Sequence, residues 1–188
     1  ARLFFQRHNG RVVLKPLSVG YVEAPDGTLE AQIYTSMLRQ EHLYDARLLE
    51  QCPTLLQQQI AKVEDVRITI IDDFVTAIGL SPRDGHAPVD IRETDPRQIV
   101  YTEVPLPSDT CTQVLHLVKR LGLRFAAVDM IRSEGNQWVF LEINPNGQWA
   151  WMDLLGGSKI ASGFIAVFRD TMVNIAISRV TQSPPAHA

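Results

Sequence analysis

Short runs of β-branched and other apolar residues recur along the chain, and each run has the length of a strand. Most are bounded by Gly, Asp or Asn, and they cover Val12–Lys15, Gln32–Thr35, Leu55–Ile60, Val66–Ile71, Val75–Leu80, Arg124–Ile131 and Gln137–Ile143. Asp72-Asp73 separates one adjacent pair of runs, and Ser133–Asn136 separates the last two. Because both spacers consist of turn-forming residues, each pair predicts a β-hairpin.

Between the strands, apolar residues at helical spacing predict three helices. Met37–Gln51 ends before Pro53, Asp109–Leu121 begins after Ser108 and ends at Gly122, and Lys159–Val180 places its apolar residues mostly along one stripe. Antiparallel strand pairs with interspersed helices predict an α+β fold of antiparallel sheets with flanking helices.

Composition and charge narrow the class of protein. A chain of 188 residues with 45% hydrophobic content can bury one sizeable core or two small lobes. Its net charge of −3 and its scattered 18 Lys and Arg give no indication of nucleic-acid or membrane binding. Cys52 and Cys111 lie far apart, and no apolar stretch approaches the ~20 residues of a membrane span. We therefore expect a cytoplasmic protein. Because Ala1 is not an initiator methionine and Phe4 to Lys15 resembles the middle of a domain, we also expect a further part before Ala1.

Two neighbouring strands place oxygen-bearing residues among apolar ones. Asp129 lies on one strand, and Glu142 and Asn144, two positions apart and hence on one face, lie on the next. A buried carboxylate is costly unless a charge or hydrogen bonds compensate it, and Mg²⁺ prefers oxygen ligands. The three residues therefore predict a magnesium site. The alternative is that Asn144–Gly147 is only a turn and that Glu142 is an ordinary charge at a strand end.

Phe140–Trp149, preceded by Phe125–Ile131, resembles the metal-binding signature of ATP-grasp ligases, in the form found in graspetide (microviridin-type) synthetases. Upstream blocks are similar to that family in the same order, namely Val12–Leu17, Ile33–Thr35, Gln57–Ile60, Asp65–Arg67 and Val89–Arg92. The resemblance spans about residues 11 to 180. It implies an ATP-grasp fold in which residues 1–80 complete the smaller lobe, 81–181 form the C-terminal lobe with the magnesium site, and 182–188 are a flexible tail.

The same resemblance implies roles for individual residues. Lys15 would contact phosphate, Asp65 would accept from the ribose hydroxyls, and Arg67 and Arg92 would stabilise charge on a transferred phosphoryl group, Arg92 being favoured. The segment that would form the adenine hinge contains Gln57, Gln58 and Ile60. The alternative for Lys15 is a surface lysine, and the alternative for the hinge segment is an ordinary strand that enters a turn. For Arg92 the alternative is a solvated surface ion pair. The chain departs from the family pattern by having glutamines where related hinges often carry an acidic residue, and few glycines where a phosphate-covering flap is common.

The function implied is an ATP- and Mg²⁺-dependent carboxylate ligase. A substrate carboxylate would become an acyl phosphate, which a hydroxyl or amine then attacks, joining side chains of a ribosomal precursor peptide with leader and core as esters or amides. A homodimer is left open. The alternatives are a RimK-type ligase acting on a protein or small acceptor, and a noncatalytic nucleotide- or peptide-binding module or inactive fragment.

Overall fold

The computed structural model describes residues 1–17, 21–44 and 53–181. The chain divides into two compact units, which we treat separately. Unit 1 consists of Ala1–Val63 and Ser81–Ile99, and unit 2 consists of Glu64–Leu80 and Val100–Ala188. The chain thus passes from unit 1 to unit 2, returns, and crosses again. The lobe boundary at residue 80 that the family resemblance implies stays a prediction.

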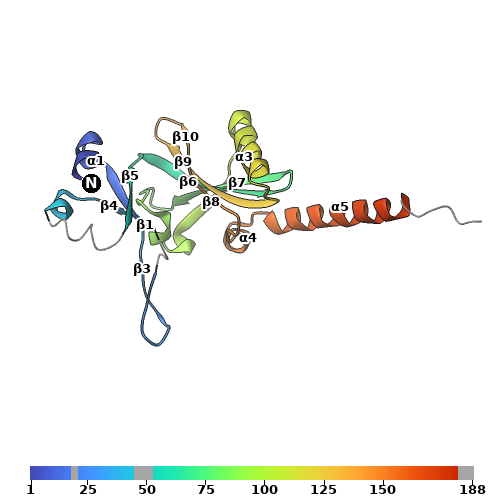
Figure 1. Ribbon diagram of the computed structural model, residues 1–188, viewed down its shortest axis with the longest axis horizontal. Helices are drawn as coiled ribbons and strands as arrows, with labels where there is room; N and C mark the ends of the chain where they lie inside the picture. Colours follow the sequence, from blue (N-terminus) through green and yellow to red (C-terminus); the bar gives the residue numbers. More distant parts are fainter. Residues whose placement is uncertain (18–20, 45–52, 182–188) are drawn as a thin grey trace, which may run out of the picture. The chain divides into compact units, whose positions relative to one another are not determined.

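Unit 1 is built on a three-stranded antiparallel sheet with β1 (Val12–Pro16) between β4 (Ser36–Met37) and β5 (Thr54–Gln58). Val12 on β1 packs with Leu38, Leu43 and the aromatic rings of helix α1 (Arg2–Arg7). A separate hairpin joins β2 (Tyr21–Glu23) to β3 (Leu29–Gln32) (Figure 1). The described residues of this unit also form three short 3-10 helices: η1 (Gln40–Leu43), η2 (Ile91–Glu93) and η3 (Pro96–Gln98).

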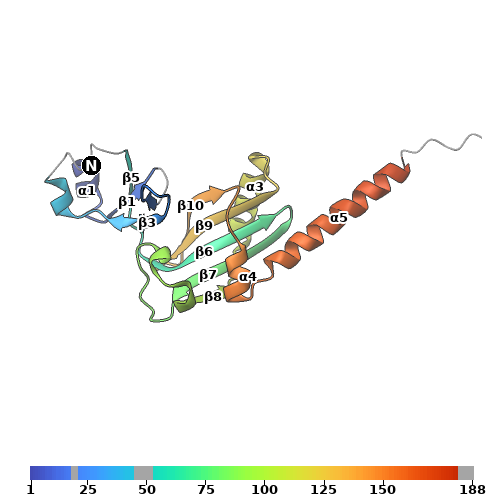
Figure 2. The same cartoon turned by 90° about the horizontal axis from the view of Figure 1, so that it is seen from below.

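Unit 2 is built on a five-stranded sheet in the order β10-β9-β6-β7-β8, which Figure 2 shows side by side. The strands are β6 (Lys62–Ile71), β7 (Phe74–Pro82), β8 (Ile99–Glu103), β9 (Phe125–Ser133) and β10 (Trp138–Asn144). Three helices accompany them: α3 (Ser108–Arg120), α4 (Ala150–Gly156) and α5 (Ile160–Thr181). Both predicted hairpins are confirmed, because β6 pairs with β7 and β9 with β10 in antiparallel register.

The two faces of the five-stranded sheet differ in chemistry. One face packs against α3, and its buried core comprises Val66, Ile68, Ile70, Ala77, Val114, Val118, Ala126, Val128 and Met130. Side chains alternate along a strand, so the intervening residues of β6 and β9, among them Arg67 and Asp129, point to the opposite face. The period-two pattern therefore places Arg67 and Asp129 on the face away from α3. Glu64 and Arg132, which form an ion pair at 2.7 Å, instead have the register of the core residues.

Two sequence predictions in unit 1 are wrong in part. The expected strand Gln32–Thr35 ends at Gln32, and the Thr35 N–H donates to the Asp90 carboxylate at 2.9 Å instead of to a neighbouring strand. The expected helix from Met37 does not begin there, because Ser36–Met37 pairs with β1, and only Gln40–Leu43 is helical, as a 3-10 turn. The rest of that predicted helix, from residue 45, lies outside the described residues. The sequence patterns did not predict α1, β8 or α4.

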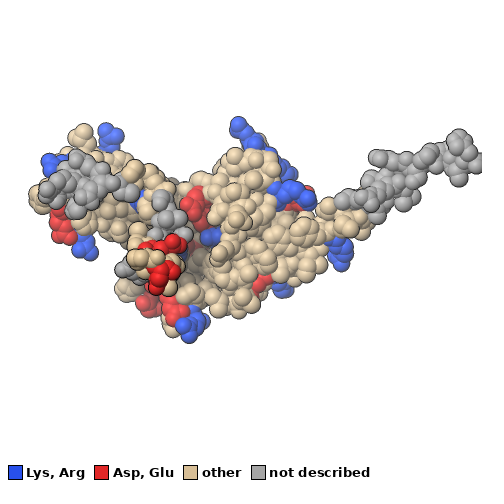
Figure 3. Space-filling model, turned by 60° about the horizontal axis from the view of Figure 1, so that its bottom comes forward, with Lys and Arg blue, Asp and Glu red and all other residues tan. Residues whose placement is uncertain are grey.

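The basic side chains are spread over the surface in view (Figure 3). Figure 3 shows Lys and Arg lying singly across the face in view rather than gathered into one patch. Within the described part of the chain, no helix is long and apolar enough to span a bilayer.

Candidate metal and nucleotide site

A β-bulge in β10 determines where Glu142 points. Val139 lies opposite Ile131 and Phe140 opposite Met130, but after an irregularity in register Glu142 lies opposite Asp129. Without the extra residue, Glu142 would face Val128, whose side chain is in the α3 core. Bulges insert one residue and re-aim the side chains that follow. This one places the Glu142 carboxylate beside that of Asp129, on the face away from α3.

Arg67 lies next to this pair from the adjacent strand. Its Nε is 2.5 Å from Asp129 Oδ1, an ion pair that does not meet the angular geometry of a hydrogen bond. Its Nη1 donates to the Gln148 carbonyl oxygen at 3.4 Å. Asp65, two positions earlier on β6, lies on the same face. Asn144 is opposite Ala127 and so also lies on this face. Five of the residues predicted from sequence are therefore brought to one surface of unit 2.

Asp129 has an unusual electrostatic environment. Burial raises the pKa of its carboxyl, the Arg67 charge opposes that shift, and the neighbouring Glu142 carboxylate raises the pKa further. The net result is a pKa of about 6. Two carboxylates held side by side destabilise each other's ionised form unless a cation lies nearby. One arginine with an imperfectly directed contact does not fully compensate them.

The donor set fits Mg²⁺. Two carboxylates and an amide oxygen on one face match the way Mg²⁺ is commonly bound, with one or two protein carboxylates and the remaining positions left to water and phosphate. Glu142 and Asn144 are exposed and Asp129 is half-buried, so a phosphate group could reach all three. Among the described residues there is no cluster of three or more His, Cys, Asp and Glu that could hold a metal by itself. Asn144 adds a third oxygen donor on the same face.

Asn144 also forms the turn that the alternative interpretation predicted. Its Oδ1 accepts a hydrogen bond from the Asn146 N–H at 2.8 Å. A carbonyl oxygen has two lone pairs, so this bond leaves one for a cation. The turn and the metal role are therefore compatible, and the turn fixes the orientation of the amide.

In unit 1, the predicted residues fall on two faces of the small sheet. Val13 lies opposite Gln57 and Lys15 opposite Leu55, so Lys15 and Gln57 share one face. Gln58 lies opposite Val12 and points to the other face, toward α1. Ile60 follows the end of β5 and is half-buried. Of the two glutamines, only Gln57 therefore has its side chain on the Lys15 face.

Arg92 is held by a neighbouring aspartate. Asp90 accepts from the Arg92 backbone N–H at 3.1 Å, from its Nε at 2.8 Å and from its Nη2 at 2.5 Å, as well as from Thr35. Burial by itself raises the pKa of Asp90, but the Arg92 and Thr35 hydrogen bonds and the Arg92 charge outweigh it and lower the pKa to about 2. The sequence analysis did not assign Asp90 a role. An Asp just before a short helical turn is nevertheless a common N-cap, which could have identified it as a hydrogen-bond acceptor.

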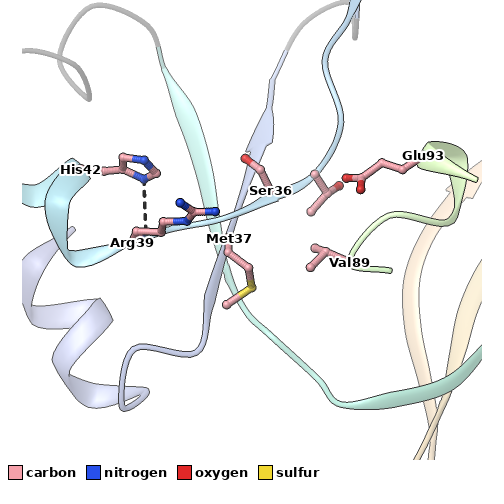
Figure 4. Close-up of a pocket in the computed structure, with 7 residues that line it drawn as sticks. Ser36, Met37, Arg39, His42, Val89 and Glu93 are labelled. Atoms are coloured by element: carbon pink, nitrogen blue, oxygen red, sulfur yellow. Dashed lines mark hydrogen bonds between the residues drawn. The ribbon is translucent and has the colours of Figure 1, made fainter. Parts of the chain in front are cut away.

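A pocket of about 380 Å³ lies close to this aspartate. It is lined by Thr35, Ser36, Met37, Arg39, His42, Val89 and Glu93. In Figure 4, Arg39 and His42 lie on one side of Ser36 and Glu93 on the other. None of the site residues predicted from sequence is among those that line it.

Three solved structures resemble this chain. Macrocyclase MdnC from Microcystis aeruginosa MRC, bound with precursor peptide MdnA, shares 27% identity at a TM-score of 0.66 and matches 81% of this chain and 45% of its own. A Chryseobacterium gregarium RiPP-associated ATP-grasp ligase, in complex with ADP and a leader and core peptide, shares 25% identity at a TM-score of 0.71. The match covers 82% of this chain and 46% of the ligase. ATP-grasp ligase PsnB, complexed with a precursor variant, Mg and ADP, shares 19% identity at a TM-score of 0.66. The match covers 88% of this chain and 48% of PsnB. This chain has the ATP-grasp fold.

The comparison confirms the predicted α+β ATP-grasp fold and the resemblance to RiPP-associated ATP-grasp ligases. The chain spans a little less than half the length of each of these three structures. No protein-family model matches it, and no curated protein does. The ligands and products of these longer enzymes are therefore only proposed for this chain.

Proposed function

We propose that this chain is an ATP-dependent carboxylate ligase that joins side chains of a ribosomal precursor peptide as esters or amides. The observation that supports this most directly is the Asp129–Glu142 pair, turned by a bulge to the same face as Arg67 and Asn144. On an ATP-grasp fold, such a cluster of oxygen donors is suited to the Mg²⁺ that accompanies ATP.

The chemistry needs no nucleophile from the protein. A carboxylate oxygen of the peptide attacks the γ-phosphorus of ATP, ADP leaves, and an acyl phosphate forms. A hydroxyl or amine then attacks the acyl carbon, phosphate leaves with the bonding electrons, and a proton is lost. The protein must position the reactants and stabilise charge. This matches a site that has carboxylates, an amide and an arginine.

Asp129, Glu142 and Asn144 would hold Mg²⁺, which when bound neutralises charge on the phosphate oxygens. Arg67 would stabilise the charge of the transferred phosphoryl group with the N–H groups that Asp129 and Gln148 leave free. Arg92 is the second arginine proposed for this role. Its guanidinium forms two hydrogen bonds with Asp90.

The remaining nucleotide contacts are proposed from the family resemblance. Lys15 would contact phosphate from the end of β1, and the backbone of the segment from Gln57 to Ile60, which includes Gln58, would bind adenine. Asp65 would accept from the ribose hydroxyls. The neighbours that contain precursor peptides favour a peptide over a small acceptor as substrate. A homodimer and a cytoplasmic location stay predictions.

Two measurements test the proposal. The first is binding of ATP to the purified chain by calorimetry, with Mg²⁺ and with a chelator. The second is ADP release and peptide mass after addition of a short Thr-, Asp- and Glu-rich peptide encoded beside the gene. We expect Mg²⁺-dependent binding and a product lighter by one water per crosslink.

The other outcomes separate the alternatives. ADP release with mass added to an acceptor would indicate a RimK-type ligase. Nucleotide binding without ADP release would indicate a binding module. No nucleotide binding in the presence of Mg²⁺ would overturn the ligase proposal for this chain.

A further inference from the structure

The loop after β10 folds back over β9 at one tightly packed point. Asn144 lies opposite Ala127, and the turn that its side chain caps brings Gly147 onto the same alanine. Gly147 is buried, although the residues on both sides of it are exposed. The loop is therefore anchored through a glycine backbone rather than through a side chain.

Gly147 has no space for a side chain. A Cβ built on it would lie 2.3 Å from Ala127 Cβ, far inside the contact distance. The next nearest atoms would be Arg67 Nη1 at 3.4 Å and Ala127 Cα at 3.7 Å, which are ordinary contacts. Gly147 is not among the residues with positive φ, so an alanine would suit its backbone. One methyl group of Ala127 is thus the obstacle, and it is held rigidly on a buried strand.

This contact places the next residue against Arg67. The Gln148 carbonyl accepts from Arg67 Nη1 at 3.4 Å and from Trp151 Nε1 at 3.2 Å. Arg67 in turn is paired with Asp129. At the other end of the loop, the Asn144 amide is oriented by the same turn. The contact of Gly147 with Ala127 therefore lies between Asn144, a proposed metal ligand, and Arg67, the proposed phosphoryl-binding arginine.

The geometry points to Gly147 and Ala127 as a positioning pair for the Mg²⁺–phosphate site. The close approach of the two residues sets the height of the Asn144–Gln148 loop above the sheet, and through it the placement of the Asn144 amide and the Arg67 guanidinium. Neither Gly147 nor Ala127 contacts ligand in this assignment. The inference rests on the proposed function, because its consequence is measured at the Mg²⁺ site.

The test is a rescue. Gly147→Ala should raise the Mg²⁺ concentration that half-saturates ATP binding by about 10- to 100-fold, the usual effect of disturbing groups that orient metal ligands. Gly147→Ala combined with Ala127→Gly removes the clashing methyl and should return that concentration to within a few-fold of wild type. Gly135→Ala is the matched control, because a Cβ there would meet nothing closer than Ser133 Oγ at 3.8 Å. It should bind as wild type does.

Calorimetric titration of the full chain with ATP at fixed Mg²⁺ concentrations gives these values, and circular dichroism reports folding. An unaltered Gly147→Ala, or a double variant that stays impaired, overturns the inference. If Gly147→Ala fails to fold, the double variant still decides, since it should fold and bind. A wild-type chain without Mg²⁺-dependent ATP binding overturns the proposed function and this inference together, whereas a normal wild type with an unaltered Gly147→Ala overturns the inference alone.

Discussion

Two of the aspartate–arginine pairs among the described residues, Asp90–Arg92 and Asp129–Arg67, behave in opposite ways. In unit 1, Asp90 accepts from the backbone N–H groups of Thr35 and Arg92 and from the Arg92 guanidinium, and its pKa falls to about 2. In unit 2, Asp129 is also beside an arginine, yet burial and the adjacent Glu142 raise its pKa to about 6. The same two residue types thus give a well-compensated carboxylate in one place and an under-compensated one in the other.

The difference lies in what surrounds each carboxylate. Hydrogen bonds to the ionised form stabilise it, and a like charge nearby destabilises it. Asp90 has its donors within the chain and needs no further partner. Asp129 shares its position with a second carboxylate, and a bound cation would remove the conflict. The well-compensated carboxylate of Asp90 therefore suits a structural role, whereas the under-compensated carboxylate of Asp129 suits the proposed cation site.

The largest expected effect is on turnover. Glu142→Gln keeps the shape of the side chain and removes one charge from the proposed metal site. We expect a loss of activity on the order of 100-fold or more, as when one electrostatic stabiliser of a reacting group is removed. ADP release with the peptide substrate measures it. Because repulsion with Asp129 disappears, the variant should be at least as stable as wild type without Mg²⁺. Unchanged turnover would remove Glu142 from the site.

The second effect is on the stability of unit 1. Asp90 is 7% exposed and accepts from Thr35 and Arg92. Asp90→Asn leaves these donors without their charged acceptor and should cost about 2 kcal/mol of unfolding free energy. Urea denaturation measures the change. Asp95→Asn is the matched control, since Asp95 accepts from Arg97 in the same way but is exposed, and it should cost far less. Equal costs for the two variants would contradict a buried structural role for Asp90.

The third effect is stabilisation by Mg²⁺, which should depend on the carboxylates around Asp129 and not on Asp90. Mg²⁺ should stabilise the wild type by about 1.4 kcal/mol when present at ten times its dissociation constant, because it binds the folded form. We expect this increment to vanish in Glu142→Gln and to persist in Asp90→Asn. Thermal unfolding with and without Mg²⁺ measures it. An increment that survives in Glu142→Gln would place the cation elsewhere.

The smallest effect is a pH dependence. The folded pKa of Asp90, about 2, lies below the ordinary aspartate value of 3.8. The stability that Asp90 contributes is therefore fully present above the unfolded value and is lost as the pH falls toward the folded one. The difference in unfolding free energy between wild type and Asp90→Asn should shrink by about 1 kcal/mol between about pH 6 and about pH 3. A constant difference would show that the charge of Asp90 is not what stabilises unit 1.

Part of this picture could be predicted from sequence. The two hairpins follow from β-branched runs separated by turn residues, and α3 and α5 follow from helical spacing. The prediction failed at Ile33–Thr35 and at the start of the predicted helix, Met37–Arg39. In both segments, distant partners override local preference: Asp90 accepts from Thr35, and β1 pairs with Ser36–Met37. Such partners leave no trace in the local pattern.

For the candidate site, the sequence by itself determined the donor inventory, because Asp129, Glu142 and Asn144 are the oxygen-bearing residues in two apolar strands joined by a turn. Only the tertiary structure decided how those residues meet. Nothing in the apolar character of Leu141 signals the bulge that turns Glu142 toward Asp129. The contact of Arg67 with Asp129 depends on β6 lying beside β9, and strand order is set by burial of the whole sheet rather than by neighbours in the chain. Alternation along a strand is local and readable, whereas contacts across a sheet arise only when the core assembles.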